Sequence, residues 1–135
     1  MKLTNNFTLD ELCHSNTAKL KKIRNNADEE QIENLRTLTI RLLQPLRDIY
    51  GYPMYINSGF RSQEVNKLVG GVPTSQHTKG QAADVRVENP RKLLSVLLQS
   101  GLIFDQAILY PTFLHLSYNT GNNRRQVLYA KGVKP

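Results

Sequence analysis

The stretch Ser-Gln-His-Thr-Lys-Gly-Gln-Ala-Ala-Asp, from Ser75 to Asp84, decides how this chain is interpreted. It places His77 in a loop whose Thr-Lys-Gly allows a sharp turn, and it then enters a predicted strand over Ala82–Val87. Alternate residues of a strand share a face, so Asp84 points the same way as Ala82, a small residue that leaves the carboxylate room. The stretch therefore predicts an imidazole and a carboxylate close to each other.

A further histidine, His115, lies in a second predicted strand, Phe113–Tyr118, and projects from otherwise apolar or aromatic surroundings. Taken singly, His115 is also explained as a hydrogen-bonded core histidine, and Asp84 as a buried acid paired with backbone amides or an arginine. Taken together, His77, Asp84 and His115 form a ligand set that suits zinc and leaves a fourth position for water. Zinc lowers the pKa of such a water to about 7, so hydrolysis of an amide is the predicted reaction.

The first third of the chain is predicted to be helical. Leucine and isoleucine recur at helical spacing over Asp28–Tyr50, which predicts one long amphipathic helix. Pro45 lacks a backbone donor and predicts a kink or break near Leu43. Asn26 and Glu29 have the spacing of a capping box at its start. Shorter helices are predicted over Thr8–Cys13, Ala18–Lys22, Ser62–Leu68 and from Asn89–Pro90 to Gly101.

The remaining elements are short strands, predicted over Met54–Asn57, Ala82–Val87, Gln106–Tyr110, Phe113–Tyr118 and Gln126–Ala130. Strands this close in sequence usually pair antiparallel. The predicted fold class is therefore α+β: a helical N-terminal third packed on a small, mainly antiparallel sheet that bears a single zinc site. The length of 135 residues suits one hydrophobic core, so residues 1–135 are predicted to form a single domain.

Composition and charge exclude several classes of protein. The apolar fraction of 39% and charged fraction of 21% are typical of a soluble globular chain, and no apolar run approaches a membrane span. The polar N-terminus does not resemble a signal peptide, so we expect synthesis in the cytoplasm without one. The lone Cys13 cannot form an internal disulfide and is expected to be a buried thiol.

The net charge of +7 suits an anionic partner. Nucleic acid is not expected, because the chain has no basic repeat, no zinc-finger spacing and no aromatic-rich strand. A carboxylate-bearing polymer such as bacterial cell wall would be attracted by the same charge.

A wider set of residues resembles a known family. Three motifs occur in order along the chain: Ser58-Gly59-Phe60-Arg61, Ser75-x-His77-x-x-Gly80-x-Ala82-x-Asp84, and His115. Together they are similar to the signature of the zinc D-alanyl-D-alanine carboxypeptidases and related phage endolysins. The resemblance also covers Phe7–Leu12, Asn57–Asn66, Gly70–Gly71, Phe104–Gln106 and Arg124–Leu128, which is nearly the whole chain. It is most like the small phage-type branch that cleaves peptidoglycan peptides.

The resemblance implies a role for each matching residue. It assigns Zn²⁺ as the cofactor, with His77, Asp84 and His115 as its ligands. Arg61 would stabilise negative charge on the scissile carbonyl, although an ion pair explains it too. Ser75 would bind substrate, or its hydroxyl would stabilise the turn before His77. The resemblance further implies action on peptidoglycan peptides after a holin or a virion gives access to the wall. A monomer is expected, because nothing in the sequence suggests an obligate partner surface.

One residue departs from the family pattern. Many members carry a general-base glutamate three residues before the last histidine, where this chain has Thr112. Loss of positioned proton transfer typically costs 10²- to 10⁴-fold, so activity could be weak. Four residues could replace the glutamate, and the sequence does not choose among them: Asp105, Glu88, Glu64 and the Tyr110 hydroxyl. The alternative function is a zinc-stabilised binding domain, as in the similar N-terminal signalling domain of hedgehog proteins.

Overall fold

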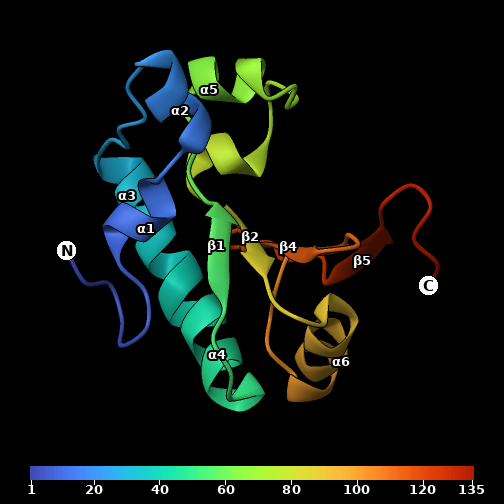
Figure 1. Cartoon of the computed structure of the whole chain (residues 1–135). Coiled ribbons are helices and arrows are strands. Elements are labelled where there is room, and N and C mark those ends of the chain that lie inside the picture. The colour runs from blue at the N-terminus through green and yellow to red at the C-terminus, as the bar shows by residue number, and fades with distance from the viewer.

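A five-stranded sheet forms the centre of the structure, a computed structural model that describes residues 1–135 (Figure 1). The strand order is β1-β2-β4-β3-β5, and neighbours are antiparallel except β3 and β5, which are parallel. The strands are β1 Tyr55–Ser58, β2 Ala82–Arg86, β3 Gln106–Leu109, β4 Phe113–Ser117 and β5 Gln126–Tyr129. The predicted α+β class with a mainly antiparallel sheet is confirmed.

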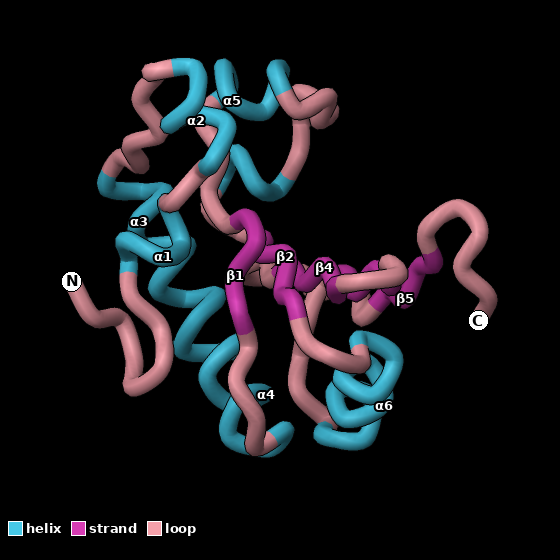
Figure 2. Tube along the Cα trace, viewed as in Figure 1, coloured by secondary structure: helices cyan, strands magenta, loops and turns pink.

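The helices lie on both sides of this sheet, with the strands crossing the middle of the molecule (Figure 2). Those in the N-terminal half are α1 Leu9–Cys13, α2 Asn16–Lys21, α3 Glu29–Leu38, the π-helix η1 Thr39–Leu43 and α4 Gln44–Tyr50. Those that follow β1 are α5 Gln63–Leu68, the 3-10 helix η2 Gln76–Lys79 and α6 Pro90–Ser100. None of them has the length and apolar character needed to span a membrane.

The predicted long helix is present from Glu29 to Tyr50, and its interruption lies where Pro45 predicts it. Pro45 offers no N–H and its ring crowds the preceding turn, so the five residues before Gln44 widen into η1, where the Gln44 N–H donates to the Thr39 carbonyl. The predicted cap at Asn26 and Glu29 is wrong. Asp28 is the N-cap and forms the capping box with the side chain of Gln31, because the helix begins later than Asn26 would require.

One face of the sheet is the core. Residues such as Val85, Leu114 and Leu116 alternate inward from β2 and β4 and join a single cluster of 20 buried residues that includes the leucines of α3, η1, α4 and α6. The opposite face carries Asp84 and His115 and is not covered by α3, α4 or α6. Burial of alternate strand residues thus fixes which side chains remain available for chemistry.

The last strand differs from its prediction. β5 was expected to pair antiparallel with a sequence neighbour, but it lies parallel to β3 at the edge of the sheet. After β4 the chain crosses over, and the Arg125 and Gln126 N–H groups donate to the carbonyls of Phe104 and Asp105, which precede β3. Because β5 enters beside the start of β3, the two strands run in the same direction.

Candidate metal centre

His77 lies on η2, a single turn that the sequence fixes at both ends. The Ser75 hydroxyl accepts a hydrogen bond from the His77 N–H at 3.2 Å and begins the turn. Gly80, with φ +75°, ends it in a conformation that favours glycine. The His77 side chain is 2% exposed, and its Nδ1 lies 2.7 Å from the Gly59 carbonyl oxygen. Because a carbonyl only accepts, Nδ1 carries the proton and Nε2 faces the remainder of the site.

Asp84 and His115 are direct cross-strand partners on β2 and β4. The Asp84 Oδ1 atom lies 2.8 Å from His115 Nδ1 and 3.3 Å from His77 Nε2. The two imidazole rings are 5.1 Å apart between centroids. One ligand atom from each of the three residues lies within 4.8 Å of the others, so the structure brings the predicted ligand set together.

The electrostatics of this set fit a divalent cation. Burial disfavours the charged form of Asp84, but hydrogen bonds to His115 and His77 outweigh it and hold the pKa of the carboxyl well below its usual range. His77 Nε2 and the Asp84 carboxylate face each other at 3.3 Å, so a cation bound by both would displace the proton between them. Two nitrogens and one oxygen form a donor set that suits zinc.

Arg61 lies beside these ligands. Its backbone N–H donates to the His77 carbonyl at 3.0 Å, and its side-chain Nε is buried with no hydrogen-bond partner. Burial lowers the pKa of Arg61, while the charges of Asp84 and then Tyr110 oppose that shift. Arginine remains charged in proteins, so the site holds a partly desolvated cation with a donor to spare.

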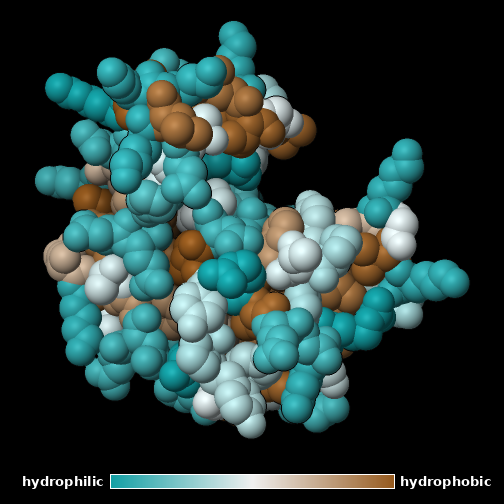
Figure 3. All heavy atoms as spheres, in the orientation of Figure 1, coloured by the Kyte–Doolittle hydropathy of each residue, from teal (hydrophilic) through white to brown (hydrophobic).

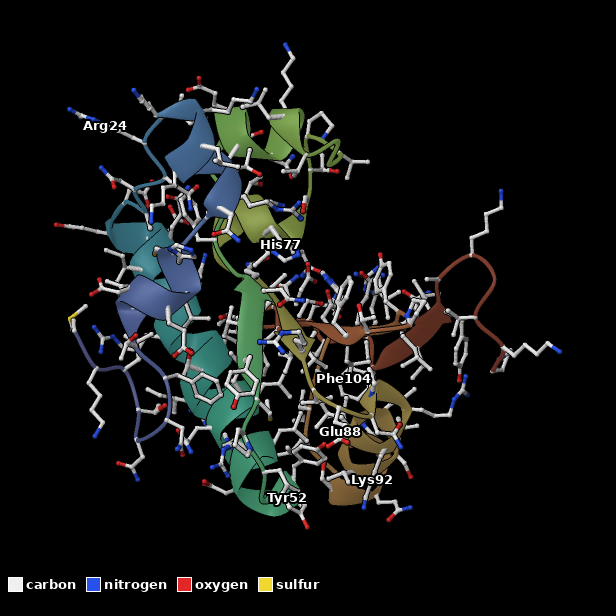
Figure 4. All side chains as sticks on the ribbon, in the orientation of Figure 1. Arg24, Tyr52, His77, Glu88, Lys92 and Phe104 are labelled. Carbon is white, nitrogen blue, oxygen red and sulfur yellow. The ribbon has the colours of Figure 1, made fainter.

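The four residues open into a cleft of about 720 Å³. Figure 3 shows the surface hollowed between the lobe that contains α5 and the side formed by β4 and β5, with hydrophobic side chains gathered over α5. Figure 4 shows His77 between that lobe and the strands. Residues that line the cleft besides the ligands and Arg61 include Val69, Val72, Ser75, Gln76, Lys79, Asp105, Tyr110, Phe113 and Arg124.

The residues considered for proton transfer separate in space. Tyr110 and Asp105 line the metal cleft, whereas Glu88 and Thr112 line a different hollow and Glu64 lines neither. Tyr110 stacks on Phe113 at 4.3 Å between ring centroids. Ser75 also lines the cleft, and its hydroxyl makes the turn-stabilising bond as well.

A second cluster in the cleft, centred on Asp105, was not predicted from the sequence. Asp105 is 1% exposed and accepts from Arg124 Nε at 2.8 Å and Arg124 Nη2 at 2.9 Å. Gln76, the residue before His77, donates to the same carboxylate at 3.0 Å. No spacing pattern connects residues so far apart, although the position of Gln76 next to a predicted ligand was a weak indication. The orienting carbonyl of Gly59 is a backbone group and has no sequence signal.

A His-Asp-His set and a charged arginine that share one open cleft are the arrangement expected of a metal-dependent hydrolase. A family model described as Peptidase M15 matches residues 5–117. The chain therefore belongs to the Peptidase M15 family, a family of zinc peptidases. No curated protein matches it.

Proposed function

We propose that this protein is a zinc-dependent peptidase that hydrolyses peptide bonds in bacterial peptidoglycan, as a D,D-carboxypeptidase or an L-Ala-D-Glu endopeptidase. The observation that carries the proposal is the His77, Asp84 and His115 set, whose ligand atoms lie within 4.8 Å of one another in a cleft open to substrate. When bound, zinc supplies Lewis acidity, which activates water and polarises a carbonyl. Lys79 adds positive charge along the cleft, which suits a substrate rich in carboxylates.

Arg61 stabilises the negative charge that develops on the scissile carbonyl oxygen. Its guanidinium is close enough to interact with the charge of Asp84, and it keeps one buried donor without a partner in the protein. A donor that is already desolvated and positioned pays little reorganisation when charge appears on the substrate. Ser75 binds the substrate backbone from the same side of the cleft as His77.

Tyr110 is the proton carrier in this proposal. Asp105 is in the cleft but is occupied by Arg124 and Gln76, and Glu64 and Glu88 lie elsewhere. Stacking on Phe113 holds the Tyr110 ring, and Phe113 is two residues before His115 on β4. The phenol hydroxyl donates its proton to the leaving amine, and the resulting phenolate takes up the proton that the attacking water releases.

A binding domain stabilised by zinc is the second candidate function. It is favoured by one feature of the cleft: neither carboxylate that lines it, Asp84 or Asp105, is free to act as a general base.

For the peptidase, residues 1–135 act as one domain and one chain supplies every site residue, which supports a monomer. Its place of action is the cell wall, reached through a holin or on a virion.

Digestion of purified peptidoglycan tests the function. Zinc-loaded wild type should release new amino groups between pH 6 and 9, and His77→Ala should release none because it loses a metal ligand. Tyr110→Phe should lower turnover about 10²-fold or more while its zinc content stays that of wild type. Arg61→Ala should likewise lower turnover more than zinc content.

Two results would contradict parts of this proposal. No release by wild type above the His77→Ala background, with zinc fully bound, favours the binding domain. Full activity in Tyr110→Phe would show that Tyr110 does not donate the proton.

A further inference from the structure

A second hollow lies next to the metal cleft and is larger, about 1090 Å³. It is bounded by the end of α4, the start of β1, the turn from β2 into α6, and the turn between β3 and β4. Figure 4 shows three of its residues, Tyr52, Glu88 and Lys92, between the ends of α4 and α6. The lining residues are Tyr50, Tyr52, Pro53, Tyr55, Arg86, Val87, Glu88, Asn89, Lys92, Pro111 and Thr112.

This tyrosine hollow, defined by those residues, begins one row of side chains from the metal ligands. Arg86 is two residues beyond Asp84 on β2, so both point to the same face of the sheet. Tyr55, Arg86 and Phe113 are cross-strand partners in the neighbouring row. Two residues along a strand span roughly 7 Å, so the hollow starts about that far from the metal row. It then turns around the end of the sheet towards α4 and α6.

Three tyrosines line the hollow, and two of them expose much of their surface. Tyr52 is 62% exposed and Tyr55 is 51% exposed. Tyr50 packs edge to face against Tyr52 at 5.6 Å, and the Arg86 guanidinium lies over one side of the Tyr55 ring at 4.8 Å. Both rings are therefore held by neighbours while much of their surface remains open to a ligand.

Polar groups surround these rings: the positively charged Arg86 and Lys92, the negatively charged Glu88 and the neutral Asn89. A sugar ring needs this combination, because the C–H bonds on one side of it pack against the electron-rich face of an aromatic ring while its hydroxyl and acetamido groups need polar partners. A purely apolar partner would leave Glu88 and Lys92 desolvated without compensation.

We propose that the tyrosine hollow binds a saccharide, specifically a short stretch of β-linked N-acetylhexosamine chain. The proposal rests on the proposed function, because such a chain bears the peptides that the metal cleft would hydrolyse. A glycan in the hollow holds its attached peptide beside the metal row, and this raises the local concentration of the substrate. Tyr52 and Tyr55 stack on the sugars, and Asn89 and Lys92 bond their polar groups.

The test uses a peptide-free probe, an N-acetylglucosamine oligomer, titrated into zinc-loaded protein with amide NMR and calorimetry. We expect shifts at Tyr52, Tyr55, Arg86 and Lys92 and saturable binding. Tyr52→Ala and Tyr55→Ala should each weaken it about tenfold, as expected for loss of one aromatic stacking contact. Tyr129→Ala is the matched control, because Tyr129 is an exposed tyrosine on β5 that does not line the hollow. It should bind like wild type, and far-ultraviolet circular dichroism establishes that each variant is folded.

Three outcomes would overturn the inference: no saturable binding by folded wild type, shifts confined to the metal cleft, or equal weakening in Tyr129→Ala. The two proposals can fail separately. Peptidoglycan hydrolysis without saccharide binding would leave the peptidase and remove the glycan site. Saccharide binding to the hollow without peptidoglycan hydrolysis would leave the glycan site and remove the peptidase.

Discussion

At the scale of single residues, Asp105 shows how a buried charge stabilises the cleft. Its carboxylate accepts hydrogen bonds from Nε and Nη2 of Arg124 and from the side-chain amide of Gln76, so it joins the loop before β5 to the turn that carries His77. The hydrogen bond from Arg124 is the main reason that the pKa of Asp105 lies below its usual range, and burial only partly opposes it. The ionised form of Asp105 therefore stabilises the folded chain.

Asp105→Asn should lower the free energy of unfolding by about 2 kcal/mol at pH 7, because charge-assisted hydrogen bonds are lost. A folded pKa below the unfolded value gives a contribution that is complete above about pH 4 and is lost as the pH falls through the folded pKa. Urea unfolding at several pH values measures this difference.

The matched control is Glu33→Gln, which breaks the exposed pair between Glu33 and Arg36. It should change the free energy of unfolding by less than about 1 kcal/mol. A difference between wild type and Asp105→Asn that persists unchanged at pH 3 would contradict the role of ionisation.

The residues of the metal set could be predicted from sequence because each one is a side chain whose chemistry is visible in its type. His77 and Asp84 lie in one short stretch, and His115 is alone on its predicted strand. The structure brings one ligand atom from each of the three residues within 4.8 Å of the others, which supports the proposed ligand set. The Asp105 cluster could not be predicted, since it depends on three segments that only the fold brings together.

At the scale of elements, α3 acts as the support for η2. The Gln31 and Asn34 side chains donate to the carbonyls of Thr78 and Lys79, so the helix holds the turn that carries His77. Gly80 packs directly against this helix, and a Cβ there would collide with the Gln31 carbonyl oxygen. Close approach of η2 to α3 therefore requires glycine.

Gly80→Ala should cost more stability than Gly101→Ala and should also weaken zinc binding. Both glycines have nearly the same positive φ, +75° and +76°, but a Cβ at Gly101 meets nothing within 4 Å. The alanine at 101 costs about 1–2 kcal/mol from backbone strain alone, and the collision at 80 adds about 1–3 kcal/mol. Chemical denaturation and zinc titration measure the two effects. Equal losses in both variants would show that contact with α3 is unimportant.

Most elements could be predicted because apolar periodicity, Pro45 and the capping residues act locally. The N-cap of α3 was placed too early, at Asn26, because Asp28 competes with it and has Gln31 at the spacing that a capping box requires. The direction of β5 could not be predicted, since the hydrogen bonds from Arg125 and Gln126 to Phe104 and Asp105 are long-range contacts.

At the scale of the whole molecule, the metal set adds a cross-link between the turn η2 and two neighbouring strands of the sheet, β2 and β4. η2, β2 and β4 each supply one ligand, and the His77 ring reaches back to the Gly59 carbonyl just after β1. A ligand that binds only the folded chain stabilises all of these contacts at once.

Zinc at about 100 times its dissociation constant should add about 2.7 kcal/mol and raise Tm by roughly 10 °C. A chelator should reverse the rise. His115→Ala should lose it, whereas His14→Ala should keep it, because His14 bonds Asn16 and lies outside the set. Differential scanning calorimetry measures each shift. A full rise in His115→Ala would show that zinc binds elsewhere.

The parallel strand β5 has a consequence for how relatives of this protein diverge. The match to the family model ends at residue 117, before the segment that brings Arg124 to the cleft and β5 to the edge of the sheet. All three metal ligands precede that segment, and edge strands have only one neighbour to satisfy. Changes after residue 117 can therefore alter the wall that faces substrate without touching any of the three metal ligands.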